Sequence, residues 1–297
     1  MRWLLPLVLL AIMVSFAGCS SDNGNGASSG SASPAASATA TRSPGGSSAP
    51  DSLLPSPNPN APLYIALGDS LSAGVGATDR TSTAFVPLVQ KGLPAGTGLL
   101  NLGQSGDTSA NLLDHGHVAR AVSEIQARNH DNNPDNDVKL VTVEIGGNDL
   151  LGLFFTLVVP GKCPNVTEGL QRPECVNALR DVFEKYTPNL KSTLDQLQAA
   201  DPNVKIALLT LYNPFSGGAA GFDALAQLAL EGMPDTPFPD GLNDLIRAQA
   251  QSSNVTLVDS YPLFAGKAHQ YIAVDLIHPN DAGYRVIADA VLQAIGS

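Results

Sequence analysis

The sequence predicts an α/β fold in which a parallel sheet of about five strands is covered by helices on both faces. Short apolar runs rich in β-branched residues alternate with longer segments that carry apolar residues at helical spacing. This alternation of strand and helix repeats about five times. Such a repeat is typical of parallel sheets enclosed by two layers of helices.

Five segments are predicted as strands. The two clearest are Leu63–Leu67, which Gly68 stops, and Val138–Ile145, which two glycines stop. Further strands are expected at 205–211 and 255–259, with a weaker one at 98–102. Helices are expected where apolar residues recur at helical spacing, near 110–128, 175–200, 241–251 and 281–295.

The first 18 residues have the features of an export signal. Arg2 precedes an apolar run at 3–17, which is shorter than the ~20 residues of a membrane-spanning helix. Small residues directly before Cys19 resemble a bacterial lipobox, although Phe16 replaces the usual leucine. We expect residues 1–18 to be a lipoprotein signal peptide, with Cys19 lipidated and the protein exported to the bacterial cell envelope. An ordinary secretory signal with an incidental Cys19 is the alternative.

Residues 19–62 are predicted to be a flexible tether. They consist mostly of Ser, Gly, Ala, Thr, Asn and Pro and have too few large apolar residues to bury a core. A chain of this length reaches roughly 35–40 Å from its anchor. Residues 63–297 then form one domain of ordinary size.

The charge of the chain limits its partners. The formal net charge of −11 becomes −12 without the signal peptide, because Arg2 is the only charged residue in residues 1–18. An acidic chain without a basic patch is not expected to bind nucleic acid. We expect a monomer that contacts the membrane through its lipid anchor.

Cys163 and Cys175 are the two cysteines of the predicted domain. In an exported protein they are expected to form a disulfide, and the small loop that it closes corresponds to ~3 kcal/mol of stabilisation on a chain-entropy estimate. A two-cysteine metal site is the competing interpretation, but no histidine lies nearby in the sequence.

Residues suited to acyl transfer follow the predicted strands. Ser70 follows the first strand, Gly106 the second and Asn148 the third, while Asp275 and His278 precede the last helix. Because the carboxyl ends of parallel strands meet at one edge of the sheet, we expect these residues to gather there. A serine hydroxyl needs a base to become a nucleophile, and His278 oriented by Asp275 can act as that base.

The blocks that contain these residues make the chain resemble the GDSL, or SGNH, family of hydrolases from residue 63 to the C-terminus. The blocks stand in the family's order: Gly68-Asp69-Ser70-Leu71, Gly106, Gly146-Gly147-Asn148-Asp149, and Asp275-Leu276-Ile277-His278. The resemblance implies a flavodoxin-like, three-layer α/β/α sandwich and a serine ester hydrolase without a cofactor. It implies Ser70 as nucleophile, Asp275 and His278 as its acid–base pair, and an oxyanion hole formed by the Ser70 and Gly106 N–H groups and the Asn148 side chain.

The identity of the ester is left open by the sequence. A small-molecule or lipid ester is expected, and a carbohydrate O-acetyl esterase, a lysophospholipase and a non-catalytic lipoprotein that binds acylated ligands are alternatives. Phe154 or Phe155 can line an acyl pocket, or can belong to a buried core helix. The segment 213–240 is interpreted as a flap over the acyl group or as a rigid surface insertion.

Other motifs are interpreted as structural. His115 and His117 lie beside Asp114, but residues two apart do not share a helical face and no third ligand is evident, so no metal is expected. The segment 131–137 lacks the Gly and Glu of a calcium loop and is expected to be a turn. Within residues 63–297, the predicted domain, the Gly-x-Ser-x-Gly turn of α/β-hydrolases does not occur.

Overall fold

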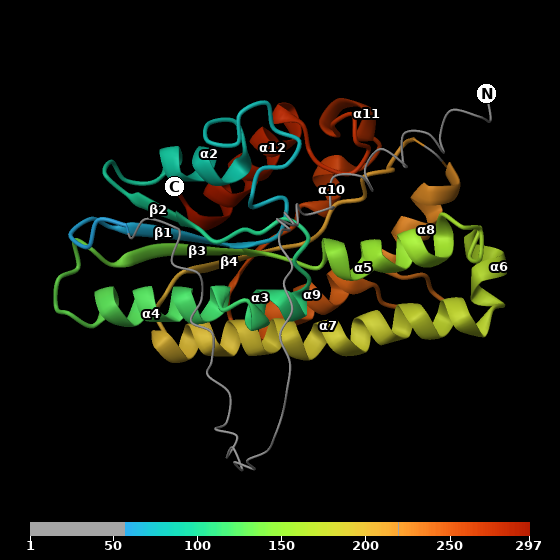
Figure 1. The fold of residues 1–297 in the computed structure, drawn as a ribbon, viewed down its shortest axis with the longest axis horizontal. Helices are drawn as coiled ribbons and strands as arrows, with labels where there is room; N and C mark the ends of the chain where they lie inside the picture. The colour runs from blue at the N-terminus through green and yellow to red at the C-terminus, as the bar shows by residue number, and fades with distance from the viewer. Residues whose placement is uncertain (1–56, 219) are drawn as a thin grey trace, which may run out of the picture. The chain divides into compact units, whose positions relative to one another are not determined.

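The structure is a computed structural model that describes residues 57–218 and 220–297. Five strands form one parallel sheet in the order β2-β1-β3-β4-β5 (Figure 1). The predicted α/β fold is therefore confirmed, and every predicted strand is found. The strands are β1 (Leu63–Gly68), β2 (Gly98–Asn101), β3 (Val138–Glu144), β4 (Ile206–Leu209) and β5 (Thr256–Val258).

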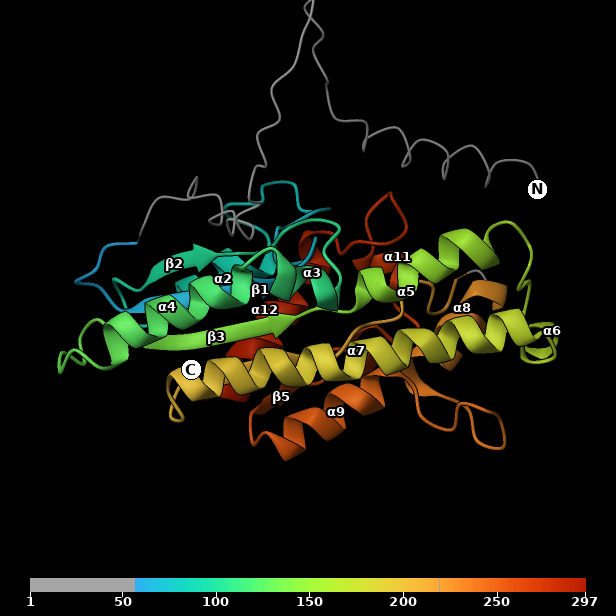
Figure 2. The ribbon, with the colours of Figure 1, turned by 60° about the horizontal axis from the view of Figure 1, so that its bottom comes forward.

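Helices cover both faces of this sheet, which makes a three-layer sandwich (Figures 1 and 2). One face carries α2 (Phe85–Gly92), α10 (Tyr261–Phe264), α11 (Ala268–Tyr271) and α12 (Asp281–Ile295). The other carries α3 (Ser109–Asp114), α4 (His117–Asn129), α7 (Pro173–Ala200) and α9 (Leu242–Ser252). The remaining helices lie past the carboxyl ends of the strands: α5 (Gly147–Leu153), the π-helix η2 (Phe154–Val158), α6 (Val166–Leu170) and α8 (Ala220–Glu231).

The central strand β1 explains why the sheet needs cover on both sides. All six of its residues are buried, and it pairs in parallel with β2 and β3, so that Ile65 lies opposite Leu100 and Val141. Successive side chains of a strand point to opposite faces. Ile65 accordingly belongs to the core under α4 and α7, whereas Tyr64 belongs to the core under α2 and α12.

One predicted helix is interrupted. The segment predicted as a helix near 110–128 forms two helices, α3 and α4, because Gly116 between them has φ +78°. This left-handed conformation favours glycine and ends a right-handed helix. The chain therefore turns between His115 and His117, a geometry that the helical periodicity alone does not reveal.

The predicted disulfide is present in the structure. Cys163 and Cys175 are joined with their Cα atoms 6.1 Å apart. The bond connects the segment after η2 to the first turn of α7. It therefore closes a small apolar cluster around Val158 and Phe154, past the ends of the strands.

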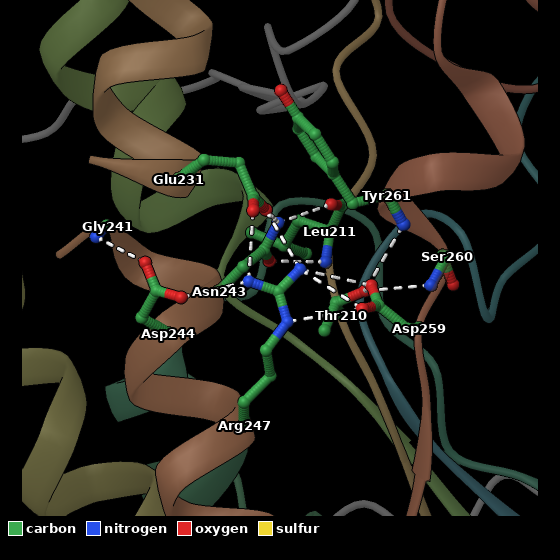
Figure 3. Close-up of polar contacts among 10 residues, drawn as sticks. All are labelled: Thr210, Leu211, Glu231, Gly241, Asn243, Asp244, Arg247, Asp259, Ser260 and Tyr261. Carbon is green, nitrogen blue, oxygen red and sulfur yellow. Dashed lines mark hydrogen bonds and ion pairs between the residues drawn. The ribbon is translucent and has the colours of Figure 1, made fainter. Parts of the chain in front are cut away.

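A cluster of charged side chains ties α8 to α9 and β5 (Figure 3). Arg247 donates to Glu231 and Asp244 at 3.0 Å and to Asp259 at 3.2 Å. The Asn243 amide donates to Glu231 at 2.7 Å and also to the backbone that follows β4. The C-terminal end of α8 is thereby fixed to the rest of the domain.

The predicted signal peptide, Cys19 and almost all of the tether lie outside the described residues, so these expectations remain predictions. Within residues 57–218 and 220–297, no helix is long and apolar enough to cross a membrane.

Candidate active site

Ser70 sits in a tight turn directly after β1. A Cβ atom at Gly68 would collide with the backbone oxygen of Glu144, so glycine is required where the chain leaves the sheet. The turn is closed by hydrogen bonds from the N–H of Val75 to the Ser70 carbonyl at 2.9 Å and from the N–H of Leu71 to Asp69 Oδ1 at 3.0 Å. This geometry holds the Ser70 hydroxyl at the carboxyl edge of the sheet.

A chain of hydrogen bonds joins Ser70 to the C-terminal part of the sequence. His278 Nε2 lies 2.9 Å from Ser70 Oγ, and His278 Nδ1 lies 2.7 Å from Asp275 Oδ2. Burial by itself would raise the pKa of Asp275, but the hydrogen bonds from the His278 ring and from the N–H groups of His278 and Ile277 outweigh it and lower the pKa. Asp275 is therefore ionised at neutral pH and accepts from Nδ1–H, which leaves Nε2 facing the serine as the acceptor.

The loop that carries Asp275 and His278 is held firmly. Asp275 Oδ1 accepts from two N–H groups of its own loop, and Leu276 adopts φ +67°, a conformation uncommon for leucine. The Tyr212 hydroxyl donates to the Ile277 carbonyl at 2.7 Å. A Cβ at Gly76 would lie 2.9 Å from His278 Cβ, so the loop after Ser70 packs directly against the histidine. Backbone strain and close packing of this kind are common where a reactive side chain must be positioned.

The structure also brings Gly106 and Asn148 to this edge of the sheet. Asn148 Nδ2 donates to the Asp107 carbonyl at 2.8 Å and to Asp69 Oδ2 at 3.1 Å. Gly106, which precedes Asp107, is exposed and has φ +92°, and open space surrounds the position of a Cβ there. Both hydrogens of the Asn148 amide are engaged, and one of them binds the residue that precedes Ser70.

Hydrogen bonds fix the Gly106 loop relative to Asn148. The carboxylate of Asp149 accepts from the N–H and the hydroxyl of Ser109, at 2.9 and 2.7 Å. A capping box between Thr108 and Asn111 starts α3 immediately after the loop. The two segments that carry the predicted oxyanion donors are therefore linked by side chains as well as by backbone contacts.

Behind Ser70 lies a buried pair of acids that the sequence reasoning did not single out. Asp69 and Glu144 are 1% and 2% exposed. Burial raises the pKa of Asp69 to about 6, and burial together with the neighbouring Asp69 charge holds the pKa of Glu144 well above its usual range. At neutral pH the pair therefore keeps one proton, on Glu144, which donates to Asp69. An acid within the apolar run of β3 was the sequence signal for this pair.

An apolar cavity opens beside Ser70. The Phe154 ring lies on its wall, and its centroid is 5.4 Å from that of Phe215 and 5.3 Å from that of Phe222. Phe154, one of the two predicted pocket residues, lines the cavity, whereas Phe155 does not belong to its lining. Much of the segment 213–240, including α8, forms one wall.

Residues 66–286 match the sequence profile of the GDSL-like Lipase/Acylhydrolase family. The chain belongs to this family. The spore germination lipase LipC of Bacillus licheniformis is 21% identical over 239 residues, which cover 78% of this chain and 95% of LipC. As a member of the GDSL-like family, the protein is a serine ester hydrolase.

Solved structures share the fold of this GDSL-family chain. An extracellular lipase from Streptomyces rimosus has a TM-score of 0.55 and 20% identity, covering 79% of this chain and 100% of that one. A lipase from a goat rumen metagenome has a TM-score of 0.52 and 19% identity, covering 79% of this chain and 97% of that one. Phospholipase A1 from Streptomyces albidoflavus has a TM-score of 0.51 and 20% identity, covering 79% of this chain and 99% of that one. At these identities the likeness supports the three-layer fold.

Proposed function

We propose that this protein is an exported carboxylester hydrolase that uses Ser70, His278 and Asp275 as a catalytic triad and accepts acyl chains longer than acetyl. The observation that carries the proposal is the hydrogen-bonded chain from Ser70 Oγ through the His278 ring to Asp275, at 2.9 and 2.7 Å, beside an apolar cavity. Nucleophile, base and orienting acid at these distances are the parts that nucleophilic acyl transfer needs.

In the proposed reaction, Ser70 Oγ attacks the ester carbonyl carbon while His278 Nε2 takes the hydroxyl proton. Asp275 keeps the other ring nitrogen protonated and stabilises the imidazolium. His278 then gives the proton to the leaving alkoxide, and an acyl-enzyme remains on Ser70. Water, activated by the same histidine, attacks the acyl carbon and releases the acid and the free serine.

The oxyanion formed in each attack would be stabilised by the N–H groups of Ser70 and Gly106 and by the Asn148 amide. Asn148 already makes two hydrogen bonds, so one must be released for this role. The bond to Asp69, at 3.1 Å, is longer than the bond to the Asp107 carbonyl, at 2.8 Å. We propose that the amide keeps the shorter bond and turns its other hydrogen from Asp69 to the oxyanion, a donor typically worth about 3 kcal/mol in the transition state.

The cavity favours a lipid-like acyl group over a sugar acetate. Its lining beside Ser70 is apolar and aromatic, with Phe154, Phe215 and Phe222 in mutual contact. Burial of each methylene of an acyl chain contributes about 0.8 kcal/mol to binding. An acetyl group would leave most of this surface unused.

The test is hydrolysis of p-nitrophenyl esters from acetate to palmitate by the protein and its Ser70→Ala variant. We expect the substitution to abolish hydrolysis at every length, and the wild type to have its highest kcat/KM above acetate. Ser72→Ala is the matched control, because Ser72 lies in the same turn but its hydroxyl donates to the Leu67 carbonyl. Activity retained by Ser70→Ala would refute the proposed nucleophile, and a preference for acetate would refute the proposed substrate class.

We also propose that the protein is held at the bacterial cell envelope by a lipid on Cys19, as its N-terminal sequence predicts. Replacing Cys19 with serine should move the protein from the membrane fraction to the medium or periplasm. The same distribution for the variant and the wild type would contradict the anchor without affecting the proposed chemistry.

A further inference from the structure

Asp107, on the loop before α3, lies close to His115, at the end of α3, and to His117, at the start of α4. Asp107 Oδ1 lies 3.0 Å from His115 Nδ1, and Asp107 Oδ2 lies 3.2 Å from His117 Nε2. The three residues can each offer one ligand atom within 4.8 Å of the others. Between the two histidines stands Gly116, whose left-handed conformation separates the six-residue helix α3 from α4.

Two buried polar atoms of this cluster face each other. Asp107 is 2% exposed, and its Oδ2 atom lies 3.2 Å from His117 Nε2. In the part of the chain that the structure describes, neither atom has a further hydrogen-bond partner. Buried polar atoms normally use their bonding capacity, so an ion bound between these groups would satisfy both. His115 has one further polar neighbour, Gln104 Nε2 at 3.3 Å from Nδ1.

We propose that Asp107, His115 and His117 bind a divalent transition-metal ion of the zinc class. Two imidazoles and one carboxylate are ligands that zinc accepts, whereas calcium and magnesium require mainly oxygen. In a tetrahedral site with metal–ligand distances of about 2.0 Å the ligands are about 3.3 Å apart. The two histidine nitrogens lie 3.0 and 3.2 Å from Asp107, each from a different oxygen of its carboxylate, which is close to that value. The His115 side chain is 42% exposed, so solvent can reach the fourth position.

The proposed ion lies next to a segment that carries a proposed oxyanion donor. The Asp107 carbonyl accepts from Asn148, and Gly106 is the preceding residue. An ion held by the Asp107 carboxylate would restrict the movement of this loop. Metal binding would thus stabilise the position of Gly106 and Asn148 without any contact between the ion and the ester.

The test is titration of the metal-free full chain with zinc chloride, followed by calorimetry and by thermal unfolding. We expect one Zn²⁺ per chain, a higher Tm in the presence of zinc, and binding at least tenfold weaker in His115→Ala and His117→Ala. His269→Ala is the matched control, because His269 is exposed and remote in sequence from the cluster. The zinc affinity of His269→Ala should be within twofold of that of the wild type.

The outcomes distinguish this site from the triad. Binding that His278→Ala removes and His115→Ala retains would overturn the proposal, because the ion would then be bound at the triad. Unchanged affinity in both cluster variants, or displacement of zinc by equimolar calcium, would overturn it as well. His115→Ala alters a partly exposed side chain, so circular dichroism can show that its fold is intact before a loss of binding is interpreted. None of these measurements requires ester hydrolysis, so they stand apart from the proposed activity.

Discussion

Replacing Glu144 with glutamine should make the stability of the protein less sensitive to pH. Glu144 is 2% exposed and faces the equally buried Asp69 behind the nucleophile turn. Burial and the Asp69 charge raise the pKa of Glu144 well above its usual range, so the folded protein holds a proton there at neutral pH. Glutamine has nearly the same shape and can also donate to Asp69, but it carries no titrating proton.

The size of the effect follows from the number of protons bound. At a pH between 4.5, the value for an unfolded chain, and the raised pKa of the folded state, the folded chain binds about one proton more at Glu144 than the unfolded chain does. The free energy of unfolding of the wild type therefore falls by about 1.4 kcal/mol for each pH unit from this group. Asp69, with a pKa of about 6, is largely ionised in both states above that pH. The variant should therefore gain up to about 1.4 kcal/mol relative to the wild type for each pH unit over which folded Glu144 stays protonated.

Urea unfolding of both proteins at pH 6, 7 and 8 measures this difference, because titrating groups outside the Asp69–Glu144 pair cancel between the two proteins. Glu184→Gln is the matched control, since Glu184 is exposed on α7 and its variant also loses one carboxyl group. A free-energy difference between Glu144→Gln and the wild type that stays constant from pH 6 to pH 8 would refute the reasoning. Glu144 would then be ionised in the folded protein.

Three further substitutions test other parts of the structure. Asp275→Asn should lower kcat roughly 10²–10⁴-fold at unchanged stability, because an amide can hold the wrong tautomer of His278, and an unchanged kcat would contradict the triad. Phe222→Ala should raise KM for a decanoate ester roughly tenfold, because about 1.4 kcal/mol of apolar contact is lost. The same substitution should raise KM for an acetate ester less than twofold. Equal effects on the KM of both esters would place Phe222 away from the acyl chain. Arg247→Met should lower Tm by about 4–8 °C, roughly 2 kcal/mol, because it leaves three carboxylates without their shared cation. Adding Glu231→Gln to this variant should recover part of the lost Tm. Thermal unfolding measures the Tm of both variants, and the same Tm for Arg247→Met and the wild type would show that the cluster contributes nothing to stability.

The fold and the approach of the site residues were predictable because both follow from topology. Parallel strands place their carboxyl ends at one edge, so residues that follow β1, β2 and β3 meet there whatever their separation in sequence. Ser70 and His278 are 208 residues apart and lie within hydrogen-bond distance. The roles assigned to them remain predictions that the kinetic experiments test.

Other features depend on contacts that no sequence period encodes. Asp107 lies close to His115 and His117 where the chain breaks at Gly116, and a helical pattern across 110–128 hides that break. Glu144 lies within the predicted apolar strand 138–145, and its pairing with Asp69 depends on the register of β1 against β3. The interpretation of 213–240 as a flap or an insertion could not anticipate the contacts of Phe222 with Phe154.

The acid pair and the proposed oxyanion hole are connected through Asn148. In the structure the Asn148 amide donates to Asp69 Oδ2, and the proposed mechanism turns that hydrogen toward the substrate oxygen. A buried carboxylate that loses a donor is costly unless another donor remains. The proton on Glu144 supplies that donor, and the N–H of Leu71 supplies a second at 3.0 Å. Asp69 can therefore release Asn148 without becoming unpaired, and its negative charge lies near His278 when the imidazole becomes positive. On this account a buried acid pair that makes folding less favourable at neutral pH lowers the cost of forming the oxyanion hole.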